Sequence, residues 1–260
     1  MKLTIAAVQY NIVWQEKEKN FLRLNTLLQN VEADVIILPE MFQTGFSMES
    51  EKLAENENDL TLAWMQQTAK AKNAALTGSF IVKENNNYYN RLFWVNPDGK
   101  YYTYNKRHLF RMAGEHRYFS PGKTKNIIEY KGFTFLPLIC YDLRFPVWSR
   151  NIQNKKPVYD CLIYVANWPE PRTNAWSKLL EARAIENLSY VIGVNRCGSD
   201  GNNIEYKGNT TIIDFKGNPV KQARPFTEDI IYSVLDLEKL KAFREKFPAY
   251  LDADQFEVVV

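Results

Sequence analysis

The sequence is poor in the residues on which several common kinds of site depend. It has only three cysteines and two histidines in 260 residues, and no two cysteines form a CxxC pair. Such a set builds no disulfide framework and provides neither a zinc-ligand spacing nor an HExxH motif. Glycine-rich phosphate-binding motifs are also missing. We therefore expect no metal, no cofactor and, because the cysteines suit a reducing compartment, a cytoplasmic location.

Long apolar runs and strong charge are missing as well. No uninterrupted apolar stretch approaches the roughly 18 residues of a membrane span, and residues 1–9 do not resemble a signal peptide. Lys and Arg number 33 against 30 Asp and Glu, a net charge of +3, with no basic block. This balance does not indicate a nucleic-acid footprint. We expect neither a membrane nor a nucleic acid as a partner.

What the chain does have is the material for a large core. Hydrophobic residues make up 45% of the sequence, with 15 Phe, 15 Tyr and 6 Trp, which excludes an open chain. No linker-like composition divides it, so we expect one domain over residues 1–260. Strands and helices alternate, which predicts an α/β fold with a mixed sheet covered by helices. The expected strands are 3–10, 35–38, 75–82, 88–95, 100–104, 126–130, 133–139, 161–166, 190–194, 209–214 and 230–234, and the expected helices are 16–31, 60–72, one after Pro146, and 173–188.

Three reactive side chains stand where expected strands end. Glu40 follows a buried run, Lys106 follows a Tyr-rich strand, and Cys140 closes another buried run before a sharp turn to Pro146. Open α/β sheets place their sites at such strand ends, and a following helix with a nearby cation favours a thiolate. Each residue alone has a plain alternative: a structural cysteine, a capping or surface acid, a solvated lysine. Together they can hydrolyse an amide without histidine, since carboxylate, thiol and ammonium act as base, nucleophile and oxyanion stabiliser.

The segments around these residues resemble a known family. Residues 38–42 (LPEMF), 105–110 (NKRHLF) and 140–146 (CYDLRFP) are similar to the three catalytic blocks of the nitrilase (carbon–nitrogen hydrolase) superfamily, in the family's order. Later segments look like blocks of its bacterial omega-amidase branch: 164–169 (YVANWP), 182–187 (ARAIEN), 196–201 (RCGSDG) and 244–248 (REKFP). The resemblance runs along essentially the whole chain.

This resemblance implies a fold, an assembly and catalytic roles. The family's fold is a four-layer α-β-β-α sandwich, usually dimerised through an outer helical layer, so we expect a homodimer or a higher homo-oligomer. Its roles map onto Glu40 as general base, Lys106 as oxyanion stabiliser and Cys140 as nucleophile. The backbone N–H of Tyr141 is expected in the oxyanion hole. Glu115 matches a second family glutamate that orients the lysine or assists proton transfer; its alternative is a surface loop acid.

The branch implies a small-molecule amide as substrate. Omega-amidases hydrolyse the terminal amide of short 2-oxo dicarboxylate monoamides such as 2-oxoglutaramate and 2-oxosuccinamate, through a cysteine thioester. The far carboxylate needs donors, for which Arg144 is the first candidate and Arg172 a weaker one. The alternative for Arg144 is a structural ion pair with Asp142 or another acid. Three aromatic residues either wall the pocket or belong to the core: Phe42, Phe110 and Trp168.

Two other functions remain open at this point. Another branch of the superfamily, a deaminated-glutathione amidase, an N-carbamoyl hydrolase or a true nitrilase, shares the same three catalytic groups. A catalytically silent scaffold is the alternative from another class, disfavoured because Glu40, Lys106 and Cys140 are all present.

Overall fold

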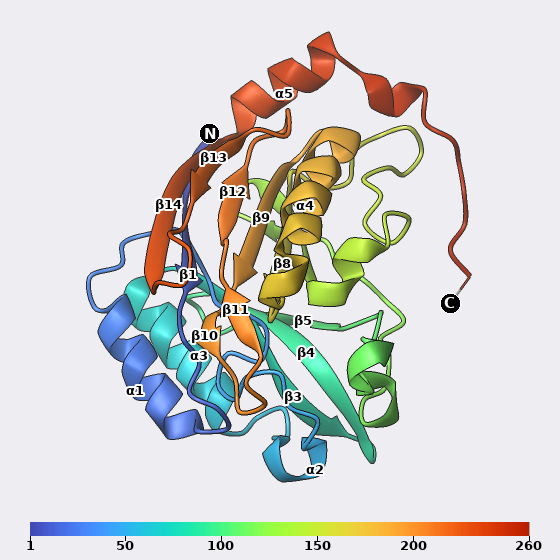
Figure 1. The fold of residues 1–260 in the computed structure, drawn as a ribbon. Coiled ribbons are helices and arrows are strands. Elements are labelled where there is room, and N and C mark those ends of the chain that lie inside the picture. The colour runs from blue at the N-terminus through green and yellow to red at the C-terminus, as the bar shows by residue number, and fades with distance from the viewer. Residues whose placement is uncertain (260) are drawn as a thin grey trace.

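Two six-stranded sheets lie face to face at the centre of the protein, in a computed structural model that describes residues 1–259 (Figure 1). The first sheet has the order β14-β1-β2-β3-β4-β5, and the second has the order β13-β12-β9-β8-β7-β6. The strands of the first sheet are β1 (Lys2–Gln9), β2 (Val35–Ile37), β3 (Ala75–Glu84), β4 (Asn87–Val95), β5 (Tyr101–Asn105) and β14 (Asp229–Asp236). Those of the second are β6 (Ile128–Tyr130), β7 (Phe133–Ile139), β8 (Cys161–Ala166), β9 (Tyr190–Asn195), β12 (Thr211–Ile213) and β13 (Pro219–Gln222). A separate hairpin pairs β10 (Cys197–Ser199) with β11 (Glu205–Lys207).

The alternation of side chains along β1 explains why the sheets stack. Leu3, Ile5 and Ala7 belong to the core between the two sheets, whereas Ala6 and Val8 belong to a second core under the helices. Successive side chains of a strand point to opposite faces, so an apolar strand buries both. Each sheet therefore needs a covering layer on its outer face.

Helices supply these outer layers. The first sheet is covered by α1 (Lys17–Leu28) and α3 (Leu60–Lys72), which contribute Phe21, Leu24 and Met65 to the outer core. The second sheet is covered by α4 (Thr173–Asn187) through Trp176 and Leu180. The layers are thus helix, sheet, sheet, helix, which confirms the expected sandwich.

The remaining elements are short or terminal. They are α2 (Ser50–Leu53), α5 (Leu237–Lys246), and the 3-10 turns η1 (Arg111–Ala113), η2 (Glu115–Arg117), η3 (Cys140–Arg144), η4 (Glu170–Arg172) and η5 (Ala249–Leu251). The side chain of Asp236 begins α5 by accepting hydrogen bonds from two backbone N–H groups of its first turn. Among residues 1–259, no helix combines the length and apolar character needed to cross a membrane.

The helix expected after Pro146 is wrong. The segment from Cys140 to Arg144 forms a 3-10 turn, and the following residues make isolated turns in which the N–H of Trp148 bonds to the carbonyl of Phe145. Trp148 is buried, and its indole N–H reaches the Tyr104 hydroxyl. This tertiary contact holds the chain in a loop at a place where the proline pattern alone favoured a helix.

Candidate active site

Two sharp turns direct the reactive side chains into the space at the strand ends. Cys140 follows β7 directly with φ of 43°, and Met41, next to Glu40, has φ of 44°. Positive φ is uncommon for residues other than glycine and costs free energy, so the surrounding structure has to hold it. At Met41 the backbone N–H donates to the Ser79 hydroxyl, 2.9 Å away.

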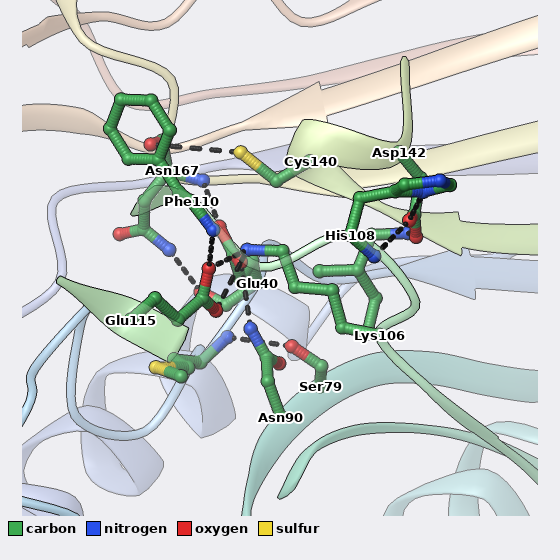
Figure 2. A network of polar contacts seen from close by, with 12 residues as sticks. Glu40, Ser79, Asn90, Lys106, His108, Phe110, Glu115, Cys140, Asp142 and Asn167 are labelled. Atoms are coloured by element: carbon green, nitrogen blue, oxygen red, sulfur yellow. Dashed lines mark hydrogen bonds and ion pairs between the residues drawn. The ribbon is translucent and has the colours of Figure 1, made fainter. Parts of the chain in front are cut away.

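A buried lysine joins two carboxylates at this point (Figure 2). The Nζ of Lys106 lies 2.8 Å from Oε1 of Glu40 and 2.9 and 3.0 Å from the carboxylate oxygens of Glu115. The side chains of Lys106, Glu40 and Glu115 are 1%, 0% and 0% exposed. Glu115 also accepts the backbone N–H of Phe110, so it is not a surface loop acid.

The carboxylate of Glu40 is held from both sheets. Its Oε1 accepts from Nδ2 of Asn90 at 2.8 Å, and its Oε2 accepts from the backbone N–H of Asn167, also at 2.8 Å. Asn90 lies on β4 in the first sheet, whereas Asn167 follows β8 in the second. Charge-assisted hydrogen bonds of this kind fix the orientation of a buried carboxylate.

The sulfur of Cys140 points toward the backbone carbonyl of Asn167, 3.9 Å away (Figure 2). Burial, reinforced by the negative charge of Glu40, raises the pKa of the Cys140 thiol well above its usual value, and the opposing effect of Lys106 is smaller. Burial alone lowers the pKa of Lys106, but the charges of Glu115 and Glu40 outweigh it and raise that pKa. The expectation that the surroundings favour a thiolate is therefore wrong for the resting enzyme. The thiol is neutral and needs a base.

A cavity of about 510 Å³ opens above these groups. Its lining includes Lys106 and Cys140 together with four of the residues expected to bind substrate: Arg144, Arg172, Phe110 and Trp168. The guanidinium of Arg144 lies 5.1 Å from the Trp168 ring centroid, and that of Arg172 lies 5.5 Å from the Phe110 ring centroid. The aromatic face attracts the guanidinium and so helps to hold it in place.

The structure separates Arg144 from Asp142. Asp142 is fully buried and bonds to Tyr104 and His108, whereas Arg144 is exposed and makes no ion pair among the described residues. The structural ion pair considered for Arg144 is absent from that part of the chain.

Phe42 does not reach the cavity, contrary to expectation. It is fully buried in the outer core under α3, with ring centroids 5.7 Å from Trp64 and 6.5 Å from Phe80. The left-handed turn at Met41 sends Glu40 to the site and Phe42 to the helix side of the sheet. Phe46 and Tyr206 line the cavity instead, and the ring of Phe46 lies 5.0 Å from the Lys106 ammonium.

Known proteins resemble this chain over almost its whole length. The carbon-nitrogen hydrolase family model matches residues 4–245. The chain belongs to the carbon–nitrogen hydrolase family. The chain is 44% identical to omega-amidase YafV of Yersinia enterocolitica, with 98% of each chain covered, and 33% identical to 2-oxoglutaramate amidase of Bacillus subtilis, with 97% and 98% covered. A CN-hydrolase superfamily protein of Xanthomonas campestris, whose structure carries an arsenic adduct in the active site, is 39% identical, covers both chains fully and superimposes with a TM-score of 0.97.

Two members of this hydrolase's site were missed by sequence reasoning. Asn90 stands in a Tyr-rich strand and carries no local signal. Asn167 lies in the YVANWP block, which could have indicated it, because an asparagine after a buried strand end occupies the same kind of position as Cys140. The other two cysteines of the hydrolase, Cys161 and Cys197, are buried outside the cavity lining. Among residues 1–259, no three His, Cys, Asp or Glu side chains are grouped so as to hold a metal ion.

Proposed function

We propose that this carbon–nitrogen hydrolase is an omega-amidase, which converts short 2-oxo dicarboxylate monoamides, such as 2-oxoglutaramate and 2-oxosuccinamate, to the dicarboxylate and ammonia. The observation that carries the proposal is a half-buried thiol beside a buried ammonium and two buried carboxylates, beneath a cavity whose lining includes two arginines. The names of the relatives from Yersinia enterocolitica and Bacillus subtilis support the same reaction.

In the first half-reaction, Cys140 is the nucleophile. Because its thiol is neutral at rest, Glu40 takes the proton as the sulfur attacks the amide carbon. The oxyanion that forms faces the Lys106 ammonium and the backbone N–H of Tyr141. The carbon–nitrogen bond then breaks, ammonia leaves with the proton returned by Glu40, and a thioester remains on Cys140. Glu115 keeps Lys106 charged and in place throughout.

In the second half-reaction, water replaces ammonia. Glu40 accepts a proton from water, which attacks the thioester carbon, and Lys106 again stabilises the oxyanion. The carbon–sulfur bond breaks, the thiol regains its proton, and the dicarboxylate leaves. These steps need the residues of this chain and a water molecule.

The far carboxylate of the substrate is bound by Arg144. A guanidinium matches a carboxylate with two parallel donors, and the Trp168 face beneath it limits its movement. Arg172, with Nη2 2.9 Å from the Met112 sulfur, is the second donor at the cavity lining. Phe110 and Trp168 form apolar walls for the short carbon chain.

Ammonia release from a panel of amides tests the proposal. The panel contains 2-oxoglutaramate, 2-oxosuccinamate, deaminated glutathione, an N-carbamoyl amino acid and a simple nitrile. We expect kcat/KM to be highest for the two short monoamides. A higher value for deaminated glutathione, the carbamoyl compound or the nitrile assigns the chain to that branch instead, and no release from any compound by a folded enzyme favours a silent scaffold.

We also propose one catalytic domain over residues 1–260, a cytoplasmic location and a homodimer. The three free, well-separated cysteines suit a reducing compartment. Exposed apolar side chains on the outer helical layer, Ile185 of α4 and Phe247 beyond α5, suit an interface between copies. Light scattering after size exclusion measures the mass, for which we expect twice 30.4 kDa.

A further inference from the structure

Asp142 is a buried carboxylate that takes no part in the proposed chemistry. It stands two residues after Cys140, is 0% exposed and accepts hydrogen bonds on both oxygens. Oδ2 accepts from the backbone N–H of Ile139 at 3.0 Å and from the hydroxyl of Tyr104 at 2.7 Å. Oδ1 accepts from the backbone N–H of His108 at 3.0 Å and lies 2.8 Å from Nδ1 of the same residue. Burying a carboxylate is costly unless hydrogen bonds satisfy its oxygens, and these four contacts do so.

These partners come from both sheets. Ile139 ends β7 in the second sheet, whereas Tyr104 lies on β5 in the first sheet, and His108 follows it. Lys106 stands midway between Tyr104 and His108, and Cys140 stands between Ile139 and Asp142. The carboxylate therefore fastens the short segment that carries the ammonium to the turn that carries the sulfur (Figure 2).

The Tyr104 hydroxyl extends this connection. Burial and the charge of Asp142 raise its pKa well above the usual value, so the hydroxyl keeps its proton and donates to Asp142. It accepts in turn from the backbone N–H of Arg107 at 3.1 Å and from the indole N–H of Trp148 at 3.0 Å. Tyr104, two residues before Lys106, and His108, two residues after it, thus both bond directly to Asp142, and the backbone of Arg107 is tied to the same carboxylate through the Tyr104 hydroxyl.

We propose that Asp142 is a positioning residue that sets where the Cys140 sulfur lies relative to the Lys106 ammonium across the interface of the two sheets. This inference rests on the proposed catalytic roles of those two residues. The turn that Asp142 holds also contains the Tyr141 N–H assigned to the oxyanion. Asn167 has the corresponding place on the other side of the site, where it ties the second sheet to Glu40.

A carboxylate is required because Asp142 faces donors on both oxygens. Two of them are backbone N–H groups that cannot become acceptors, and each faces a different oxygen. In Asp142→Asn the side chain carries an NH₂ group in place of one oxygen. Whichever way the amide is turned, that NH₂ meets a backbone N–H, so one side of the connection has to open.

The test compares Asp142→Asn with a matched control, Asp160→Asn. Asp160 also fastens the second sheet, since it accepts from the N–H and hydroxyl of Thr134 and pairs with Arg244 at 2.9 Å. It immediately precedes β8, at the end of the sheet opposite to Cys140. Both variants lose a carboxylate charge that anchors the second sheet, fully buried at Asp142 and 14% exposed at Asp160, but only Asp142→Asn alters the turn at the site.

We expect kcat of Asp142→Asn for 2-oxoglutaramate to fall about 100-fold, the loss typical of a displacement near 1 Å, with KM changed less than about threefold. Asp160→Asn should lower the unfolding temperature by about as much as Asp142→Asn does, and leave kcat within about threefold.

A third variant, His108→Phe, keeps a ring against Phe145 but removes one donor to Asp142, and it should lower kcat about tenfold. If Asp142→Asn does not fold, the kcat of His108→Phe tests the proposal in its place. A kcat within threefold of the parent in the folded variant, or an equal loss in Asp160→Asn, overturns the proposal.

A second measurement separates this inference from the proposed function. Iodoacetamide alkylates Cys140 without any substrate, and the half-buried thiol, whose pKa is raised, should react slowly in the parent. Loosening the turn should speed alkylation at least about fivefold in Asp142→Asn and less than about twofold in Asp160→Asn. If the parent hydrolyses no amide yet this difference appears, the function is wrong and the positioning holds. Equal alkylation rates in both variants overturn the positioning, whatever the substrate.

Discussion

Replacing Lys106 by glutamine separates the two effects of its charge. In the parent, the ammonium lies between Glu40 and Glu115 with all three side chains buried, so the cluster carries a net charge of −1. Lys106→Gln leaves two buried carboxylates without their cation. Breaking a buried ion pair in this way typically costs about 3–5 kcal/mol. For a chain of this size that corresponds to a fall in Tm of roughly 6–20 °C.

The same change removes an oxyanion donor. Such a loss typically lowers kcat about 100- to 1,000-fold. A neutral amide cannot match an ammonium facing a developing negative charge, so we expect the lower kcat to persist at temperatures where the variant is fully folded. Ammonia release at 20 °C, beside a thermal unfolding curve followed by circular dichroism, measures both quantities.

A second substitution shows which effect is which. Lys106→Gln combined with Glu115→Gln returns the cluster to a net charge of −1, because only Glu40 of the three groups remains charged. Glu40 still accepts its hydrogen bonds from Asn90 and Asn167. We expect the double variant to regain more than half of the lost stability and none of the lost activity. A loss of kcat below tenfold in Lys106→Gln, or activity regained together with stability, refutes the role assigned to the ammonium.

The other expectations concern the sulfur and the substrate end. Cys140→Ala should abolish ammonia release and leave the free energy of unfolding unchanged within about 1 kcal/mol. Cys161→Ala, in the core between the sheets, should keep the kcat of the parent. If Cys140→Ala keeps a tenth of the parent activity, the thioester mechanism is wrong. Arg144→Lys should lower kcat/KM for 2-oxosuccinamate about 10- to 100-fold and lower kcat/KM for a neutral short amide much less. Equal losses on the two substrates mean that Arg144 shapes the turn after Cys140 and does not bind the carboxylate. Since the raised pKa keeps Cys140 protonated, its alkylation rate should still be rising with pH above about 9, where free cysteine approaches its plateau; a plateau below pH 7 indicates a resting thiolate.

The parts of the fold that sequence could predict are those with a local cause. Apolar runs with both faces buried predicted β7 and β8, and the three- and four-residue apolar spacing predicted α1. Three strands escaped prediction because they are too short to show a burial pattern: β10 and β11 have three residues each, and β13 has four exposed residues. They are formed by pairing with a neighbour.

The same distinction applies to the site. Glu40, Lys106 and Cys140 could be predicted as candidates because each follows the end of a strand. The protonation state of Cys140 could not, since it depends on how deeply the sulfur is enclosed and on the balance between carboxylates and Lys106 in three dimensions. The place of Phe42 depends on one left-handed residue, Met41, whose conformation has no sequence signal.

The division of the site between the two sheets has a consequence for folding. Glu40 and Lys106 follow strands of the first sheet, and Cys140 and Asn167 follow strands of the second. With the proposed roles, neither sheet alone carries the nucleophile together with its base, so a chain in which only one sheet has formed should hydrolyse no amide. Activity regained during refolding should therefore measure the docking of the two sheets, which secondary structure alone does not report.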